Sequence, residues 1–398
     1  MEIEECLSLT LKELSPKTKT ISVPLTRAAG KICGADIKAE NPVPAFPKSA
    51  MDGYAVAAKD LAACDKEHPV SLKVIAELCA GDYQEIAYQE KTAVKIMTGA
   101  YVPEGYDAVV RQEDTDYGEK EVMVYTCVQP WQNYCKIGED MMPGDVVCQK
   151  GTLLTPVHIG LMASLGIREV CVIEPLKVAL LSTGSELAEL TESLMPGKIY
   201  NSISYILKAS IEKEGFEVVS SKICKDEKAL LSKEIKECTK IADIVITTGG
   251  VSVGKRDLVP EVLKDLGAKQ IFDRANIQPG TPTKASVFNQ KLILSLSGNP
   301  YAALANFELY FWSVAAHLLQ QKFYEPLVTT AIFQGEYPKK NKCRRLIRAY
   351  AENGFVTLVS NVHSSSVIAN MTECNCFIDL PAGKTMTAGD MVKIRYMK

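Results

Sequence analysis

The sequence contains few histidines, few tryptophans and no long apolar run. Among its 398 residues are four histidines and two tryptophans. No run of about 18 apolar residues occurs, which predicts a chain without membrane-spanning helices. The N-terminal stretch MEIEECLSLTLKEL also lacks the basic residues and the apolar segment of a secretory signal. Together these absences predict a cytoplasmic protein with no membrane contact.

Charge and cysteine placement exclude further classes of protein. The 45 Lys and Arg nearly balance the 48 Asp and Glu, so no general nucleic-acid-binding surface is expected. The 13 cysteines are scattered, odd in number and free of any Cys-x-x-Cys motif. That placement predicts reduced, largely buried thiols instead of disulfides or a zinc site. A hydrophobic content of 47% predicts folded domains.

Hydrophobic patterning divides the chain into parts with different expected secondary structure. A short amphipathic helix is predicted at the start, and the proline-rich segment 41–47 marks a boundary. Short β segments follow to about residue 145. After Pro175, apolar strands alternate with helices, which predicts a parallel sheet covered on both faces. The tail, 323–398, returns to short β segments and is expected to form a small barrel or sandwich.

Three turns that follow predicted strands are the strongest candidates for a binding site. They are 182–186, 247–254 and 297–300, each with glycine and hydroxyl side chains. In open α/β sheets ligands bind beyond the carboxyl ends of the strands, where glycine lets backbone N–H groups approach an anion. Neither a Walker A loop nor a GxGxxG motif occurs. A phosphate or other oxyanion ligand is therefore predicted, the alternative being ordinary strand-to-helix turns.

Carboxylates at the same predicted strand ends add a second signal. Glu186, Asp226 and Asp257 would repel an anion unless a hard cation lay between them, which favours Mg²⁺. The alternative is helix capping, where Asp and Glu are also favoured. Asp52-Gly53 is predicted to be a turn that places a carboxylate at the tip of an exposed loop.

Five motifs in order resemble those of one family, the MoeA molybdopterin molybdenumtransferases, which includes the C-terminal part of gephyrin. The motifs are 49–56 (SAMDGYAV), 96–100 (IMTGA), 182–187 (STGSEL), 247–254 (TTGGVSVG) with Asp257, and 298–300 (GNP).

The resemblance, which covers nearly the whole chain, implies a homodimer whose subunits have four domains. These are a discontinuous linker domain (1–45 and 146–175), a small mixed domain (46–145), an α/β molybdopterin-binding domain (176–322) and a C-terminal β-barrel (323–398). It also implies the reaction: adenylylated molybdopterin loses its adenylate as AMP, and molybdate is inserted with Mg²⁺ present. Other cofactor-biosynthesis proteins are possible partners, and tungstate is an alternative to molybdate.

Residue by residue, the resemblance implies three sets of site residues. The catalytic set is Asp52, Thr98, Asp140, Glu186, Asp226 and Asp257, of which Glu186, Asp226 and Asp257 would hold the metal. The substrate-binding set is Thr183, Gly184, Ser185, Gly249, Gly250, Ser252, Gly254, Lys255, Lys284, Gly298, Asn299, Pro300, Arg345 and Ser365.

The chain departs from the family pattern in one loop that matters for charge. Where relatives carry Pro-Gly-Lys-Pro, this chain has Pro279-Gly280-Thr281-Pro282, with Lys284 just beyond. Losing a lysine beside a phosphate-rich ligand is expected to weaken binding or to shift the counter-charge to Lys284, Lys255 or Arg256. Ser297 and the segment 201–203 also differ. A non-catalytic paralogue that binds a pterin or nucleotide, a dimeric scaffold and a nucleotide hydrolase are therefore the competing hypotheses.

Overall fold

The computed structural model describes residues 1–251, 258–360 and 364–398. Contacts divide the chain into two compact units. The first unit comprises Met1–Ile21, Gly30–Ile32 and Val172–Lys398, and the second comprises Ser22–Ala29 and Cys33–Cys171. The chain leaves the first unit within β1 (Thr20–Pro24), returns to it briefly at Gly30–Ile32, and re-enters it for good within β11 (Glu169–Ile173). The helix α1 (Ile3–Lys12) thus groups with the first unit, and the four-domain division stays a prediction.

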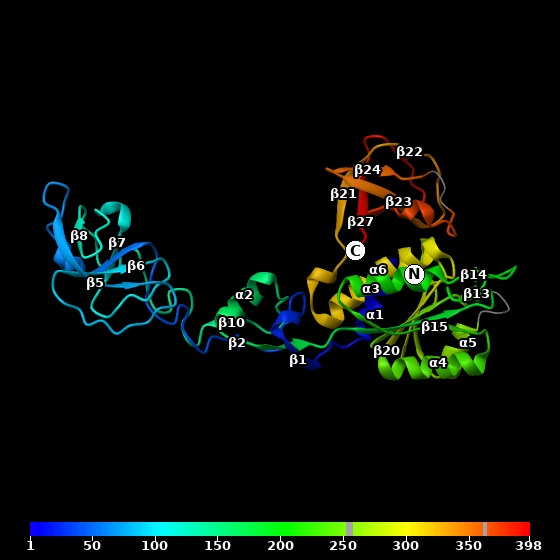
Figure 1. The fold of residues 1–398 in the computed structure, drawn as a ribbon. Coiled ribbons are helices and arrows are strands. Elements are labelled where there is room, and N and C mark those ends of the chain that lie inside the picture. The colour runs from blue at the N-terminus through cyan, green and yellow to red at the C-terminus, as the bar shows by residue number, and fades with distance from the viewer. Residues whose placement is uncertain (252–257, 361–363) are drawn as a thin grey trace. The chain divides into compact units, whose positions relative to one another are not determined.

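A six-stranded sheet forms the centre of the first unit (Figure 1). Four strands are parallel, which confirms the prediction for this part of the sheet. The pairings of the last two strands are antiparallel, so that only the fifth strand in spatial order runs against the others, which the pattern did not predict. The reversal comes from a tight hairpin in which Asn289 and Gln290 both have positive φ. In spatial order the strands are β15 (Glu217–Cys224), β12 (Lys177–Thr183), β16 (Ile244–Thr248), β20 (Lys291–Leu296), β19 (Lys284–Phe288) and β17 (Lys269–Phe272).

Helices cover both faces of this sheet, as the apolar strands require (Figure 1). Every residue of β16 is buried, because side chains on both of its faces meet helices. The helices α4 (Lys228–Ile241) and α5 (Val259–Asp265) pack on the face of Leu181 and Val245. The other face carries α3 (Ser202–Lys213) and α6 (Pro300–Leu319), and α1 packs beside α6.

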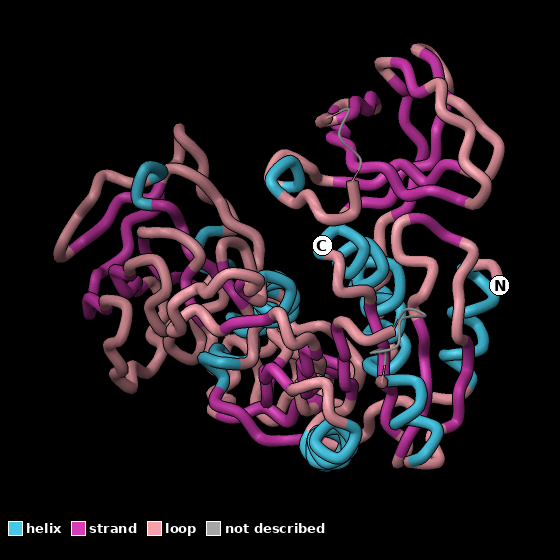
Figure 2. The backbone as a smooth tube through the Cα atoms, turned by 90° about the vertical axis from the view of Figure 1, so that its right-hand side faces the viewer, coloured by secondary structure: helices cyan, strands magenta, loops and turns pink. Residues whose placement is uncertain are grey.

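The C-terminal part of the first unit is a closed five-stranded barrel (Figure 2). Closure is completed by pairing of the first strand with the last, and inward-facing apolar residues fill the interior. A sixth strand, β18 (Ile277–Gln278), adds to the outside of β23. In order the barrel strands are β23 (Arg344–Glu352), β24 (Phe355–Leu358), β21 (Val328–Phe333), β27 (Met391–Tyr396) and β25 (Cys376–Leu380).

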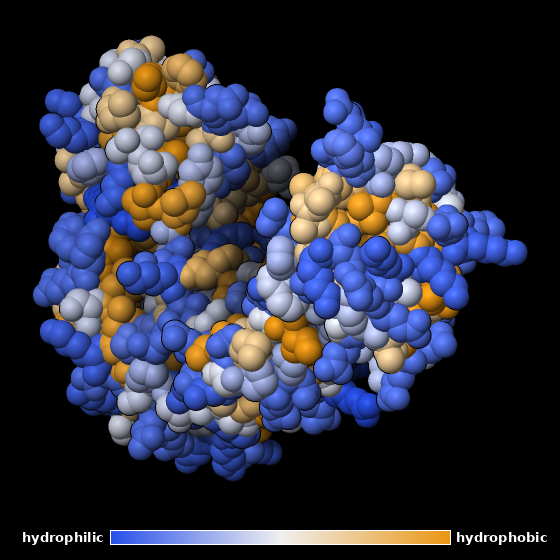
Figure 3. All heavy atoms as spheres, turned by 90° about the vertical axis from the view of Figure 1, so that its left-hand side faces the viewer, coloured by the Kyte–Doolittle hydropathy of each residue, from blue (hydrophilic) through white to orange (hydrophobic). Residues whose placement is uncertain are grey.

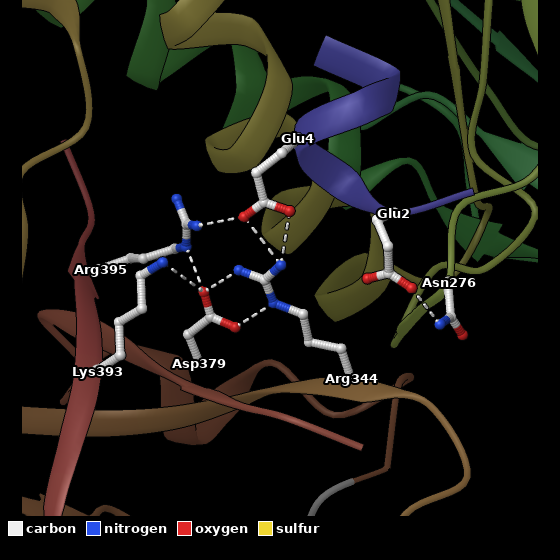
Figure 4. A network of polar contacts seen from close by, with 7 residues as sticks. All are labelled: Glu2, Glu4, Asn276, Arg344, Asp379, Lys393 and Arg395. Atoms are coloured by element: carbon white, nitrogen blue, oxygen red, sulfur yellow. Dashed lines mark hydrogen bonds and ion pairs between the residues drawn. The ribbon is translucent and has the colours of Figure 1, made fainter. Parts of the chain in front are cut away.

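An ionic network joins α1 to this barrel (Figure 4). Asp379 is buried between Arg344, which binds it through two nitrogens at 2.5 and 2.6 Å, and Arg395, whose Nε lies 2.7 Å away. Glu4 of α1 accepts two further bonds from Arg344. Burial raises the pKa of Asp379, but the two guanidinium groups more than offset this and hold it below its usual value.

The second unit contains a five-stranded mixed sheet with its own apolar core. Its strands are β7 (Ala108–Arg111), β4 (Gly53–Val56), β6 (Thr92–Ile96), β5 (Val70–Leu78) and β8 (Glu121–Val124). Segments far apart in sequence also meet where β2 (Ile37–Lys38) pairs with β10 (Val146–Cys148), next to α2 (Pro156–Ser164). The short strands β3 (Lys48–Ser49), β9 (Tyr134–Cys135), β13 (Leu187–Ala188), β14 (Ile199–Tyr200), β22 (Glu336–Tyr337) and β26 (Met386–Thr387) complete the two units.

Surface and cysteine features agree with the composition. On the face drawn in Figure 3, hydrophilic side chains predominate and hydrophobic ones occur in small separate patches. Within the described part of the chain, no helix is both long enough and apolar enough to cross a bilayer. All 13 cysteines are free thiols, and seven of them are buried.

Candidate functional site

A cavity of about 570 Å³ lies at the carboxyl ends of β12, β16 and β20. We call it the carboxyl-edge cleft. Because parallel strands end at the same edge of a sheet, the three turns that follow them are brought together here. The described lining consists of Thr183, Gly184, Ser185, Glu186, Asp226, Gly249, Gly250, Val251, Gln278, Pro279, Gly280, Thr281, Pro282, Ser297, Gly298, Asn299, Ala302 and Ser365.

Glycine is required where these turns touch one another. Gly249 has φ +85°, and a Cβ there would lie 2.2 Å from the carbonyl oxygen of Thr183. A Cβ on Gly298 would in turn lie 3.4 Å from the Cα of Gly249. The turns are therefore stacked backbone against backbone, which leaves little side-chain bulk between the strand ends and the cleft.

Asp226 organises the first turn of the cleft. Its carboxylate accepts hydrogen bonds from the Thr183 hydroxyl and, at 3.0 Å, from the backbone N–H of Ser185. Both donors are neutral, and no lysine or arginine among the described residues forms an ion pair with this carboxylate. Glu186 lies in the same turn, and its carboxylate oxygens fold back over Gly184, where a Cβ would come within 2.7 Å of Oε1. Glu186 and Asp226 thus line one cavity.

The charge of the cleft is negative in the part that the structure describes. Its lining there includes two carboxylates and neither lysine nor arginine. The loop 278–282 contributes only neutral residues. Lys284 does not line the cavity, because its Nζ donates to the carbonyl of Asp273 at 3.0 Å. An anionic ligand would therefore need positive charge from another source.

Four predicted residues, Ser252, Gly254, Lys255 and Asp257, lie outside the described residues. With that segment left out, no three His, Cys, Asp or Glu side chains form a group that could hold a metal ion. Two of the three predicted metal ligands, Glu186 and Asp226, nevertheless share the cleft, and both offer the hard oxygen donors that Mg²⁺ prefers.

The barrel contributes Ser365 to the cleft. The carbonyl of Ser365 accepts a hydrogen bond from the backbone N–H of Tyr301, at the start of α6, at 3.0 Å. Sequence reasoning missed Arg348, which holds this loop in place. It is almost fully buried, its guanidinium lies 4.0 Å over the Tyr301 ring, and it donates to the Ser364 carbonyl and to Asn370.

The arginine that the sequence indicated, Arg345, does not line the cleft. Its Nη1 donates to Asn341 at 3.3 Å, within the barrel. Three arginines occur within 344–348, and nothing in the sequence pattern distinguishes the one that faces the loop carrying Ser365.

At the last turn, the Asn299 N–H donates to the Ser297 hydroxyl at 3.2 Å, and Pro300 occupies the first position of α6.

In the second unit, Asp52 and Thr98 are hydrogen-bonded to each other. Oδ1 of Asp52 accepts the Thr98 N–H at 2.7 Å and the Thr98 hydroxyl at 2.8 Å. These bonds lower the pKa of Asp52 and favour its ionised form, and the bond from the backbone N–H has the larger effect. Asp140 is also exposed in this unit, and its N–H donates to the carbonyl of Val43.

The predicted Asp52-Gly53 turn is wrong in one respect. Gly53 has no positive φ and is the first residue of β4. Glycine is needed there because a Cβ would lie 1.8 Å from the carbonyl oxygen of Val110 on the neighbouring strand. The glycine therefore permits a close approach of two strands, and Asp52 is exposed just before the strand begins.

The chain belongs to the class of proteins in which an α/β domain with a polar cleft at its carboxyl edge is followed by a β-barrel. Residues 179–317 match the family described as a probable molybdopterin binding domain. Residues 1–166 match the MoeA N-terminal region (domains I and II), and residues 330–395 match the MoeA C-terminal region (domain IV).

Full-length relatives agree with these matches. The chain is 32% identical to a molybdopterin molybdenumtransferase of Staphylococcus epidermidis, over 99% of its own length and 95% of that protein. It is 34% identical to one from Staphylococcus aureus, over 94% and 90%. A crystal structure of a molybdopterin biosynthesis MoeA protein from Pyrococcus horikoshii superposes with a TM-score of 0.86 at 27% identity, covering 100% of this chain and 99% of that one. The chain belongs to the MoeA family of molybdopterin molybdenumtransferases, enzymes of molybdenum cofactor biosynthesis, which confirms the family and fold expected from the sequence.

Proposed function

We propose that this protein takes adenylylated molybdopterin, releases AMP and inserts molybdate into the pterin dithiolene. The observation that carries the proposal is the carboxyl-edge cleft, where Glu186 and Asp226 lie beside glycine-rich turns with no lysine or arginine in the described lining. Carboxylates so placed disfavour an anion unless a divalent cation accompanies it.

The donor chemistry of the cleft fits Mg²⁺. Glu186, Asp226 and Asp257 would hold the ion, which would supply the positive charge that a phosphoanhydride and molybdate both require. The chain's own residues would bind and orient the substrate. Ser185 and Ser365 line the cleft, and their hydroxyls would donate hydrogen bonds to the substrate.

Asp52, Thr98 and Asp140 of the second unit complete the proposed catalytic set. The two bonds from Thr98 fix the orientation of the Asp52 carboxylate, which would orient a water molecule. The proposal further includes a cytoplasmic homodimer and the four domains expected from the sequence.

The proposal is tested with purified protein, adenylylated molybdopterin, Mg²⁺ and molybdate. AMP and inserted cofactor are expected to form together and to stop when EDTA removes the metal. Asp52→Asn and Asp257→Asn should each lower the yield by about a hundredfold or more. A parallel reaction with tungstate compares the two oxyanions.

The matched control for Asp52 is Asp65→Asn. Asp65 is exposed in the same unit and also accepts backbone N–H groups, from Glu67 and His68, so its loss should leave the yield unchanged. Tight pterin binding without AMP release would contradict the proposal and favour the non-catalytic paralogue, for which the neutral loop 278–282 is the supporting observation.

A further inference from the structure

Asn306 is a fully buried polar side chain on α6 that no motif of the sequence singled out. Its Nδ2 donates two hydrogen bonds: to the carbonyl of Ala302 at 2.8 Å, one turn earlier on α6, and to the carbonyl of Pro279 at 2.9 Å. Both Ala302 and Pro279 line the carboxyl-edge cleft. One amide group therefore joins two walls of the cleft that come from different elements.

Gly280 fits against this amide. It has φ +93°, and a Cβ at this position would lie 1.8 Å from Nδ2 of Asn306. The backbone of the loop can come this close to α6 only because residue 280 has no side chain. Asn306 and Gly280 are thus complementary. Asn306 donates the hydrogen bond, and the missing side chain of Gly280 leaves room for the loop to come within reach of it.

The rest of the loop is braced within itself. The Thr283 N–H and hydroxyl both donate to the carbonyl of Gly280, at 3.0 and 2.8 Å, and the Thr281 hydroxyl donates to the carbonyl of Ile277 at 2.6 Å. These bonds give the loop its shape. The bond from Asn306 to Pro279 sets where that shape lies against α6.

We infer that Asn306 is a positioning residue of the carboxyl-edge cleft: it holds the loop 278–282 at a fixed distance from the start of α6, so that neutral groups of the loop meet the substrate. Since this loop carries no charge, it can act on an anionic substrate only through the placement of its dipoles and hydroxyls, which makes its position matter more than it would for a flexible lysine. The inference rests on the proposed function for the identity of the substrate.

The cost of burying this side chain supports a role beyond fold stability. Oδ1 of Asn306 is buried and has no hydrogen-bond partner among the described residues, an arrangement that costs free energy. An alanine or apolar residue would avoid that cost on a helix whose other side chains are largely buried and apolar. What the amide adds in return is the bond to Pro279.

Two substitutions test the inference. Asn306→Ala removes both bonds. Asn306→Ser can still donate to the carbonyl of Ala302 but is too short to reach Pro279. Both should raise KM for adenylylated molybdopterin about tenfold, the worth of about one neutral hydrogen bond, with kcat changed less than about threefold. Hydrogen exchange at the Thr283 and Ala275 amides, which bond within the loop, should accelerate about tenfold in both variants.

Glu308→Gln is the matched control, since Glu308 is buried on the same helix but contacts Trp312 and the Lys398 N–H and not the loop. It should leave KM and loop exchange at wild-type values even if the melting temperature changes. Wild-type KM and wild-type loop exchange in Asn306→Ser would overturn the inference. If the wild-type protein releases no AMP, the proposed function fails instead. Unchanged hydrogen exchange in the loop would then by itself contradict the positioning role of Asn306.

Discussion

Carboxylates at the two edges of the central sheet have opposite kinds of partner. At the amino edge, Glu174 and Asp243 are enclosed by lysines. Lys17 bridges them, with its Nζ 3.1 Å from Glu174 and 2.6 Å from Asp243. Three further lysines, 19, 177 and 291, each pair with one of the two carboxylates within 3.3 Å.

At the carboxyl edge, by contrast, the donors to Asp226 are a hydroxyl and an amide. The cleft there has no lysine or arginine in its described lining. A carboxylate that serves the fold is neutralised by the chain itself, because a buried unpaired charge is costly. In the function proposed above, a carboxylate of the ligand site would be neutralised by a cation from solution. The comparison of the two edges therefore predicts which acids of the domain are structural and which are functional.

Among the predictions that test this comparison, the largest effect is expected for Asp226→Asn. The change keeps the shape of the side chain but removes its charge, so kcat/KM for AMP release should fall by about a hundredfold or more while the melting temperature stays nearly unchanged. Asp243→Asn, at the other edge, should lower the melting temperature and leave kcat/KM intact. Equal losses of kcat/KM in both variants would show that the two edges do not differ in function.

A smaller effect, on stability, is expected for Lys17→Met. Its side chain is 10% exposed, and its loss leaves two carboxylates without their shared cation. The free energy of unfolding should fall by about 2 kcal/mol, less than for an isolated buried pair because other lysines remain. Lys19→Met is the control: that side chain is 68% exposed, and its loss should cost at most about 0.5 kcal/mol. Urea unfolding measures both, and an equal cost would contradict the bridging role of Lys17.

The smallest effect sharpens the comparison through pH. Hydrogen bonds from Lys177, Lys19 and Lys17 outweigh burial and lower the pKa of Glu174 from 4.5 to about 2. The folded protein then binds fewer protons than the unfolded chain, so this carboxylate stabilises the fold fully above about pH 4.5 and loses that effect as pH falls toward 2. Glu174→Gln should flatten the dependence of unfolding free energy on pH in this window. An unchanged slope would mean that the lysines do not act on Glu174.

Much of the fold could be predicted because it depends on local pattern. Apolar runs marked β12, β16 and β20, and the run from Pro300 to Leu319 marked α6. The antiparallel pairings of β19 and β17 escaped prediction, since the hairpin at Asn289-Gln290 lacks the glycine that usually signals such a turn. The role of Gly53 was also misassigned, because its neighbour Val110 lies far along the chain.

The candidate site divides in the same way. Glycine-rich turns and acids at strand ends are local features, so Glu186, Asp226 and the turn at Ser297 could be singled out. Arg348 and Asn306 could not, because each acts through contacts with a loop distant in sequence: Arg348 with Ser364, and Asn306 with Pro279.

The sequence by itself determined the family, the alternation of apolar strands and helices after Pro175, and the turns from which a cleft could be built. Only the tertiary structure decided which charges are neutralised and which are left facing a cavity. The physical reason is that charge pairing depends on distance in space: Lys17 and Asp243 are 226 positions apart and yet lie 2.6 Å from each other. Folding thus distinguishes one aspartate from another where residue type cannot.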